Sequence, residues 1–244
     1  MVVDFPVVVY RAWRWWSAIA VSSVIVSLAM MLYIADHPRR VSKVVDAQDV
    51  RQLVDHDFSD YYRAHPARSF AAQVWTNNAL VAAMCMILGV TIVGTVYLLV
   101  QNVLNVGVVG GLMLGAGKAG VFWGLILPHG LLELTAVFVS AGVGLRVGWA
   151  WIAPGARARS EALASAGRAA VVASIGLVGV LLVSGVIEAF VTPSGLPTYA
   201  RVGVGVVAEV AFLTYVIVLG RRGVRMGATG DLDADERESL LPSV

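Results

Sequence analysis

Residues 69–117 read SFAAQVWTNNALVAAMCMILGVTIVGTVYLLVQNVLNVGVVGGLMLGAG, a run of 49 residues without a single Asp, Glu, Lys or Arg. As an α-helix this run would extend for roughly 70 Å, enough to cross a hydrocarbon core of about 30 Å twice. A core helix of a soluble domain does not reach this length. The run therefore predicts two membrane-spanning helices and, for the chain as a whole, a polytopic membrane protein.

The composition of the whole chain agrees with this interpretation. Of its 244 residues, 58% are hydrophobic and 14% are charged, whereas soluble domains carry about a quarter charged residues. The net charge of +2 and the scattered basic residues argue against a nucleic-acid partner. The single cysteine, Cys85, excludes an intrachain disulfide and a site built from several cysteines. Nucleotide-binding and serine-hydrolase motifs are absent from the sequence, so nothing points to an ATP-driven enzyme, and we expect no cofactor.

The apolar runs predict an all-α transmembrane bundle with about six spans. These lie near residues 15–35, 78–100, 103–116, 119–145, 169–191 and 202–220. The second and third spans are expected to meet at an uncharged turn, Gln101–Asn102. Residues 1–220 then form a single membrane domain.

Two charged segments lie outside these spans. Residues 36–68 contain six Lys/Arg and six Asp, with apolar residues at roughly helical spacing. We expect an amphipathic, extracytoplasmic helix here, either a docking surface or a solvated connector. Residues 221–244 are basic and then acidic, which predicts a disordered cytoplasmic tail.

The short loops predict that both termini are cytoplasmic. The bias of the composition towards Ala, Val, Gly and Arg suits a bacterial genome, so we expect the cytoplasmic membrane of a bacterial cell. Cytoplasmic loops are enriched in Lys and Arg. With the N-terminus inside, only Lys118, Arg201 and the charge-balanced 36–68 segment lie outside. The basic residues of the inner side are then Arg11, Arg14, Arg146, Arg157, Arg159, Arg168, Arg221, Arg222 and Arg225.

Ionisable residues inside a span mark a site or a structural pair, because burying them in lipid is costly. His129 and Glu133 are four residues apart and therefore share one helix face. The same face continues through small residues, which would let a neighbouring helix approach closely. These small residues are Ala136, Ser140 and Gly144.

Pro128 precedes this pair and predicts a kink, because its ring leaves the Gly124 carbonyl without its usual donor. Gly130 would then admit another backbone or a bound group near the bend. Three interpretations of His129 and Glu133 stay open: a proton or ion relay, two ligands of a metal ion, or a buried pair that locks two helices together. A zinc site needs a third protein ligand, and the sequence offers no convincing one.

Two further glutamates lie in the later spans. Glu188 is near the end of its span, where it would snorkel to the outer surface or pair with Arg201. Glu209 is deeper, and is expected either to join a polar cluster or to bond to a neighbouring helix.

Asparagines and glycines complete the set of candidates. Asn77 and Asn78 begin a predicted span and Asn102 lies at the predicted turn, so helix capping is the simplest interpretation. Glycines repeat every four residues in the third span, a pattern typical of tight helix packing. They are Gly107, Gly111 and Gly115.

Several of these motifs together resemble the stage II sporulation protein M family. The most specific part is Pro128-His129-Gly130-Leu131-Leu132-Glu133. The resemblance covers roughly residues 70–197 and includes Asn77-Asn78, Asn102 with Gly107, and Ile187-Glu188-Ala189-Phe190. It implies a multi-pass helical membrane protein without enzymatic activity of its own. The family's namesake looks like a scaffold that recruits peptidoglycan-degrading partners.

From this resemblance we expect a non-enzymatic membrane scaffold of a cell-envelope or peptidoglycan-remodelling complex. Its expected partners are the lipid bilayer and other membrane or envelope proteins, among them peptidoglycan hydrolases, with homo-oligomers a further option. The alternative is a transporter or channel in which His129 and Glu133 line a polar path. A more distant alternative is an intramembrane metal hydrolase using the same pair.

Overall fold

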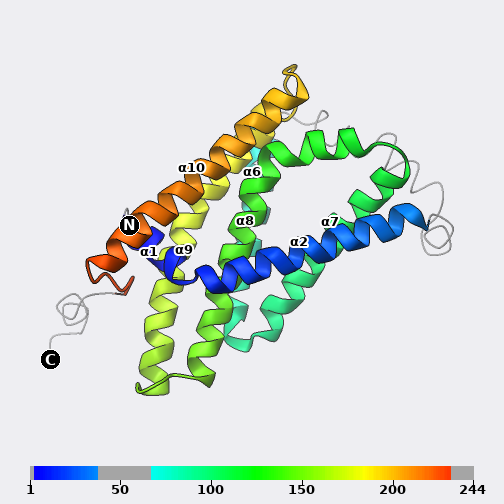
Figure 1. Ribbon diagram of the computed structural model, residues 1–244. Coiled ribbons are helices and arrows are strands. Elements are labelled where there is room, and N and C mark those ends of the chain that lie inside the picture. Colours follow the sequence, from blue (N-terminus) through cyan, green and yellow to red (C-terminus); the bar gives the residue numbers. More distant parts are fainter. Residues whose placement is uncertain (1–2, 38–66, 232–244) are drawn as a thin grey trace.

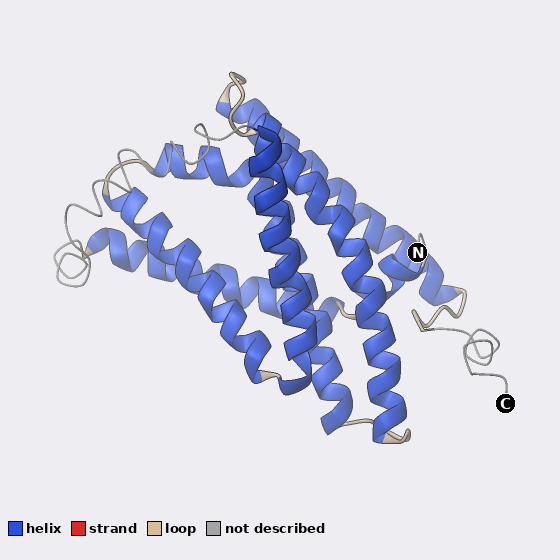
Figure 2. Ribbon diagram, turned by 180° about the vertical axis from the view of Figure 1, so that it is seen from behind, coloured by secondary structure: helices blue, strands red, loops and turns tan. Residues whose placement is uncertain are grey.

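The computed structural model describes residues 3–37 and 67–231, with residues 67–75 and 77 described by their backbone alone. All regular secondary structure in these ranges is helical (Figure 2), which confirms the predicted all-α class. Residues 38–66, predicted to form the amphipathic helix, and residues 232–244 of the predicted tail lie outside the described part of the chain.

The helices follow one another with short connections. In chain order they are α1 (Asp4–Arg11), α2 (Trp13–Asp36), α6 (Ala67–Ile87), the 3₁₀ turn η2 (Leu88–Thr91), α7 (Val93–Gly115), α8 (Ala119–Ile152), α9 (Arg159–Val186), the π turn η3 (Ile187–Val191) and α10 (Thr198–Arg225). Within the described residues, five are long and apolar enough to cross a membrane: α2, α7, α8, α9 together with η3, and α10. A shorter apolar stretch, Asn78–Thr91, runs through α6 and η2 and corresponds to the remaining predicted span.

The turn predicted at Gln101–Asn102 is wrong, because α7 continues through both residues without a break. The chain reverses instead at η2 and Ile92, whose φ of 60° is unfavourable for a β-branched residue. A hydrogen bond of 2.9 Å from the Ile92 amide to the Gly89 carbonyl closes this turn. Gly89 is buried against the backbone of α8 at Gly144, so α8 covers this side of the turn, whereas Val90 and Val93 are exposed.

α2 and α7 pack side by side and run in the same direction. Gly107 of α7 lies against Met30, and Gly115 lies against the backbone of Ala35. Gly111 lies between them against Ile34. The expected packing role of the three glycines is therefore confirmed.

α8 bends in its first part and links two hydrophobic clusters (Figure 1). Before Pro128, Phe122 packs in a small cluster with α2 and α7. After Pro128, Leu132 and the following turns enter a larger cluster with α1, α6, α9 and α10. The proline predicted to kink the helix thus lies where α8 passes from one cluster to the other.

α9 runs antiparallel to α8, and α10 runs parallel to it. The Ser184 hydroxyl of α9 donates to the His129 carbonyl, whereas at the other end of α8 Val147 shares a small pocket with Ala162. Figure 1 shows the α8–α9 connection at one end of the bundle and the α7–α8 and α9–α10 connections at the opposite end.

Both ends of the described chain lie on the same side of this bundle. The Arg11 guanidinium donates to the Ala228 carbonyl at 3.2 Å, and the guanidinium of Arg168 binds both carboxylate oxygens of Asp231. The tail is therefore not disordered from residue 221 onward as predicted, since α10 continues to Arg225 and the chain folds back as far as Asp231. That this side faces the cytoplasm stays a prediction.

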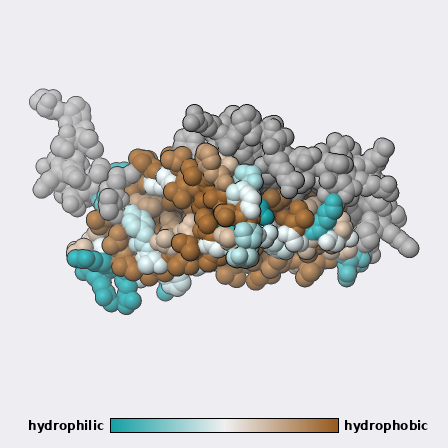
Figure 3. Space-filling model, turned by 90° about the horizontal axis from the view of Figure 1, so that it is seen from above, coloured by the Kyte–Doolittle hydropathy of each residue, from teal (hydrophilic) through white to brown (hydrophobic). Residues whose placement is uncertain are grey.

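The short N-terminal helix α1 was not anticipated. Its apolar residues are buried, and Phe5 packs against Gly176 of α9 and the ring of Phe212 of α10. Figure 3 shows hydrophobic residues over most of one face of the molecule, with hydrophilic residues at both ends and in patches between them.

Candidate functional site

His129, Glu133 and Glu188 come together inside the bundle. Each residue contributes one possible ligand atom, an imidazole nitrogen or a carboxylate oxygen, and these three atoms all lie within 4.8 Å of one another. His129 and Glu188 are each 3% exposed, and Glu133 is half-buried. The expectation that Glu188 snorkels outward or pairs with Arg201 is therefore wrong, and Glu188 supplies the third group that the sequence did not reveal.

Two irregularities in the helices position this cluster. His129 follows Pro128 directly, at the bend of α8. Glu188 lies in η3, where the chain widens to a π turn and the Thr192 amide donates to the Ile187 carbonyl at 3.0 Å. π turns within α-helices frequently occur at functional sites. Exposed residues of the α9–α10 connection begin at Pro193, so the cluster is near one end of the bundle.

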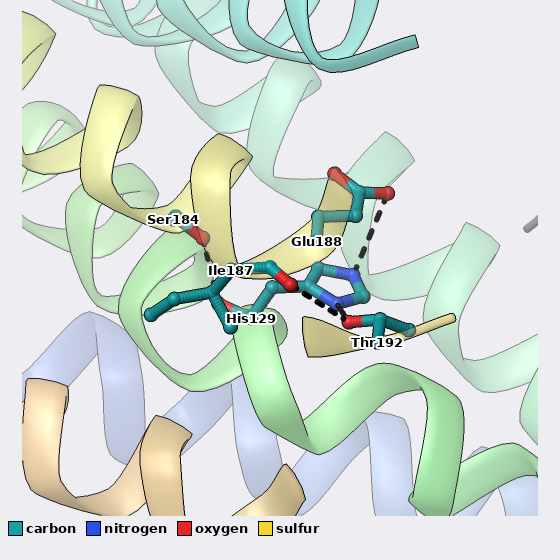
Figure 4. Close-up of polar contacts among 5 residues, drawn as sticks. All are labelled: His129, Ser184, Ile187, Glu188 and Thr192. Carbon is teal, nitrogen blue, oxygen red and sulfur yellow. Dashed lines mark hydrogen bonds and ion pairs between the residues drawn. The ribbon is translucent and has the colours of Figure 1, made fainter. Parts of the chain in front are cut away.

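The imidazole of His129 contacts groups on both sides (Figure 4). Its Nδ1 lies 3.2 Å from the Thr192 hydroxyl, and Nε2 lies 3.7 Å from Oε1 of Glu188. The Thr192 hydroxyl is 3.4 Å from the Ile187 carbonyl, to which it donates. Since that carbonyl accepts the hydroxyl proton, the hydroxyl oxygen is left to accept from Nδ1–H.

Glu133 faces side chains from two neighbouring helices. Asn78 of α6 and Ser184 of α9 lie near its carboxylate, and the Ser184 hydroxyl itself donates to the His129 carbonyl. Asn78 lies well inside α6 and is therefore not a helix cap. Among the described residues, Oε1 of Glu133 and Oε2 of Glu188 are buried without a hydrogen-bond partner.

Glu209 lies outside the cluster. Its Oε1 accepts a hydrogen bond of 2.8 Å from Thr135 of α8, so the second of the two predicted alternatives, a bond to a neighbouring helix, is the one observed. Arg201 binds elsewhere too: its guanidinium donates to the Thr192 carbonyl at 2.6 Å and to Thr198.

Of the remaining candidates, Asn102 and Gly130 play no direct part in the cluster. Asn102 donates to the Leu98 carbonyl within α7 and is neither a cap nor a turn residue. Asn77 lies in α6, and its side chain is not described. A side chain at Gly130 would meet Ile126 of its own helix, so the predicted approach of another backbone there is not observed. That approach occurs at Gly205 of α10, which packs against the Leu127 and Pro128 carbonyls.

Sequence reasoning missed Thr192, Ser184 and Gly205. Thr192 and Ser184 are fully buried hydroxyl groups in contact with His129, and Gly205 allows α10 to lie against the bend. The sequence offered one local signal, for Thr192 alone: it follows Glu188 by four residues, a spacing that places both side chains near the same helix face.

The arrangement is suited to holding a proton or a cation. Two carboxylates and one imidazole converge in a region of low dielectric, where unpaired negative charges are costly. Glu188 can therefore take part in a proton or ion relay, in a metal site or in a buried polar contact between helices, together with His129 and Glu133. A metal site would now have three protein ligands.

Comparison with family models found a match to stage II sporulation protein M over residues 16–193. The matched region contains the bend of α8, the π turn and all three residues of the cluster. A comparison with curated proteins found no match, and neither did a comparison with solved structures.

Proposed function

The chain belongs to the stage II sporulation protein M family, and we propose that it is a non-enzymatic scaffold in the bacterial cell membrane. It would gather proteins of a cell-envelope or peptidoglycan-remodelling complex. The observation that carries this proposal is the family match, which spans most of the helical bundle.

A groove between α9 and α10 supports this proposal. It encloses about 550 Å³ and is almost entirely apolar. Its walls are formed by residues spaced three and four apart on each helix, including the small residues Gly179, Ala208 and Ala211. Small residues allow helices to approach closely within a membrane. The groove therefore fits a transmembrane helix of a partner protein.

Crosslinking followed by affinity purification of the full chain in mild detergent tests the scaffold function. We expect peptidoglycan hydrolases or their membrane assembly factors to be recovered with the chain. Repeated recovery of the chain without such proteins would contradict the proposal.

A pair of matched variants tests whether the groove takes part. Gly179 and Gly167 both lie in α9 with open space around an added Cβ, but only Gly179 lines the groove. We expect Gly179→Leu to lower partner recovery and Gly167→Leu to leave it unchanged. Equal recovery with both variants would exclude the groove as the contact.

A transporter or channel is the second candidate, because three ionisable groups gather inside the bundle. Flux assays in liposomes separate the two functions. The scaffold predicts no ion flux from the wild-type chain, whereas pH-dependent flux that is abolished by His129→Ala or Glu133→Ala would favour transport.

A further inference from the structure

We propose that His129, Glu133 and Glu188 bind a divalent metal ion, with zinc as the best-fitting ion. This site is independent of the scaffold function. Imidazole nitrogen and carboxylate oxygen are both common zinc ligands, and three protein ligands with a fourth position for water form a recognised zinc geometry.

The spacing of the groups fits a shared ion. Ligands about 2.1 Å from a tetrahedral zinc ion are about 3.4 Å from one another. The Nε2 atom of His129 and Oε1 of Glu188 are 3.7 Å apart, and the three ligand atoms all lie within 4.8 Å. A rotation of the Glu133 or Glu188 side chain that moves its oxygen by up to about 1.4 Å would therefore complete the coordination.

The hydrogen bonds of the imidazole favour the metal-binding tautomer. Thr192 donates to Ile187 and so accepts from Nδ1–H of His129. In the neutral ring, Nε2 then carries the lone pair and points towards a carboxylate oxygen. A distance of 3.7 Å is too long for a hydrogen bond but suits two ligands of one cation. Thr192 would act as the outer partner that orients the ligating histidine, as is usual in metal sites.

The charges and the unpartnered oxygens require compensation. Glu188 is 97% buried, since only 3% of it is exposed, and its Oε2 has no hydrogen-bond partner among the described residues. Oε1 of Glu133 is also buried without a hydrogen-bond partner among the described residues. The guanidinium of Arg201 binds the backbone carbonyl of Thr192. A divalent cation bound through Oε1 of Glu188 and an oxygen of Glu133 would compensate the negative charge of both carboxylates.

Such an ion would fasten the bend of α8 to the π turn at the end of α9. His129 and Glu133 come from the first element and Glu188 from the second. Metal binding is therefore expected to stabilise the bundle as well as to place a cation near one end of it.

Metal content of the purified full chain tests the proposal. The protein in mild detergent is stripped with a chelator, equilibrated with Zn²⁺, freed of excess ion and analysed by elemental mass spectrometry. We expect one zinc per wild-type chain. Glu188→Gln and Glu133→Gln should each weaken zinc binding by at least 100-fold, and Thr192→Val by about 10- to 100-fold.

Glu209→Gln is the matched control, because Glu209 is an intramembrane glutamate bonded to Thr135 and lies outside the cluster. It should retain one zinc per chain. Absence of zinc from the wild-type chain, or equal zinc in wild type and in folded Glu188→Gln, would overturn the proposal.

A measurement on the wild-type chain alone covers the case in which the Gln variants fail to fold. Co²⁺ bound by one nitrogen and two carboxylate oxygens in a four-coordinate site should give intense visible absorption that added Zn²⁺ abolishes. A chain that shows no such bands with Co²⁺ has no such site.

Discussion

Gly144 lies at a close approach of α6 to α8, and replacing it with alanine tests how the bundle is held together. A Cβ at this position would collide with the carbonyl oxygen of Cys85 and lie 3.1 Å from the Cα of Met86. Both obstructing atoms belong to the α6 backbone, which cannot rotate aside as a flexible side chain does. The helix itself must therefore move.

The size of the effect follows from two opposing contributions. Overpacking a core costs about 1–3 kcal/mol, and a backbone obstacle favours the upper end of that range. Alanine in a helix is more stable than glycine by up to about 1 kcal/mol, which offsets part of this cost. The Gly144→Ala variant should therefore lose about 2 kcal/mol of unfolding free energy, which is roughly a 30-fold shift in the unfolding equilibrium.

Reversible unfolding in mixed micelles of SDS and a mild detergent, followed by circular dichroism, measures this loss. Gly179→Ala is the control, because Gly179 is also inside a helix but has open space around its added Cβ. It should gain about 0.5–1 kcal/mol. A Gly144→Ala variant as stable as the wild type would refute the packing of α6 on α8 described above.

Three further substitutions probe other contacts. Thr135→Val removes the hydroxyl that binds Glu209 and should cost about 1–3 kcal/mol in the same unfolding assay, whereas Thr135→Ser should restore stability; equal loss in both variants would count against the hydrogen bond. Asp231→Ala removes the partner of Arg168 and should change unfolding by less than about 1 kcal/mol, but it should speed proteolysis after residue 225. Gly111→Leu would drive a side chain into α2 and should lower the yield of folded protein; normal yield would argue against the α2–α7 contact.

The fold was predictable where a local property decides it. Uninterrupted apolar runs predicted α2, α8, α9 and α10 to within several residues at most ends, because a membrane requires long helices with internally paired backbone groups. The turn near residue 90 was not predictable in the same way. Leu88–Ile92 has one polar residue, Thr91, and the contact of Gly89 with the α8 backbone at this reversal is a tertiary one.

The cluster was predictable in part. The spacing of His129 and Glu133 placed them on one helix face, and their ligand atoms are indeed close. Glu188 joins them through the antiparallel packing of α9 on α8 and through the π turn, which changes the direction of side chains after residue 186. Neither feature has a signal in the sequence.

The sequence by itself determined that this chain is an all-α membrane protein of the stage II sporulation protein M type, with ionisable groups near a proline bend. Tertiary structure decided which of those groups meet, where Gly205 admits α10, and that α1 is buried between α9 and α10. The physical reason is that hydrophobicity places a helix in lipid but does not select its neighbour. That selection depends on close backbone contact at glycines and on hydrogen bonds between residues far apart in the chain.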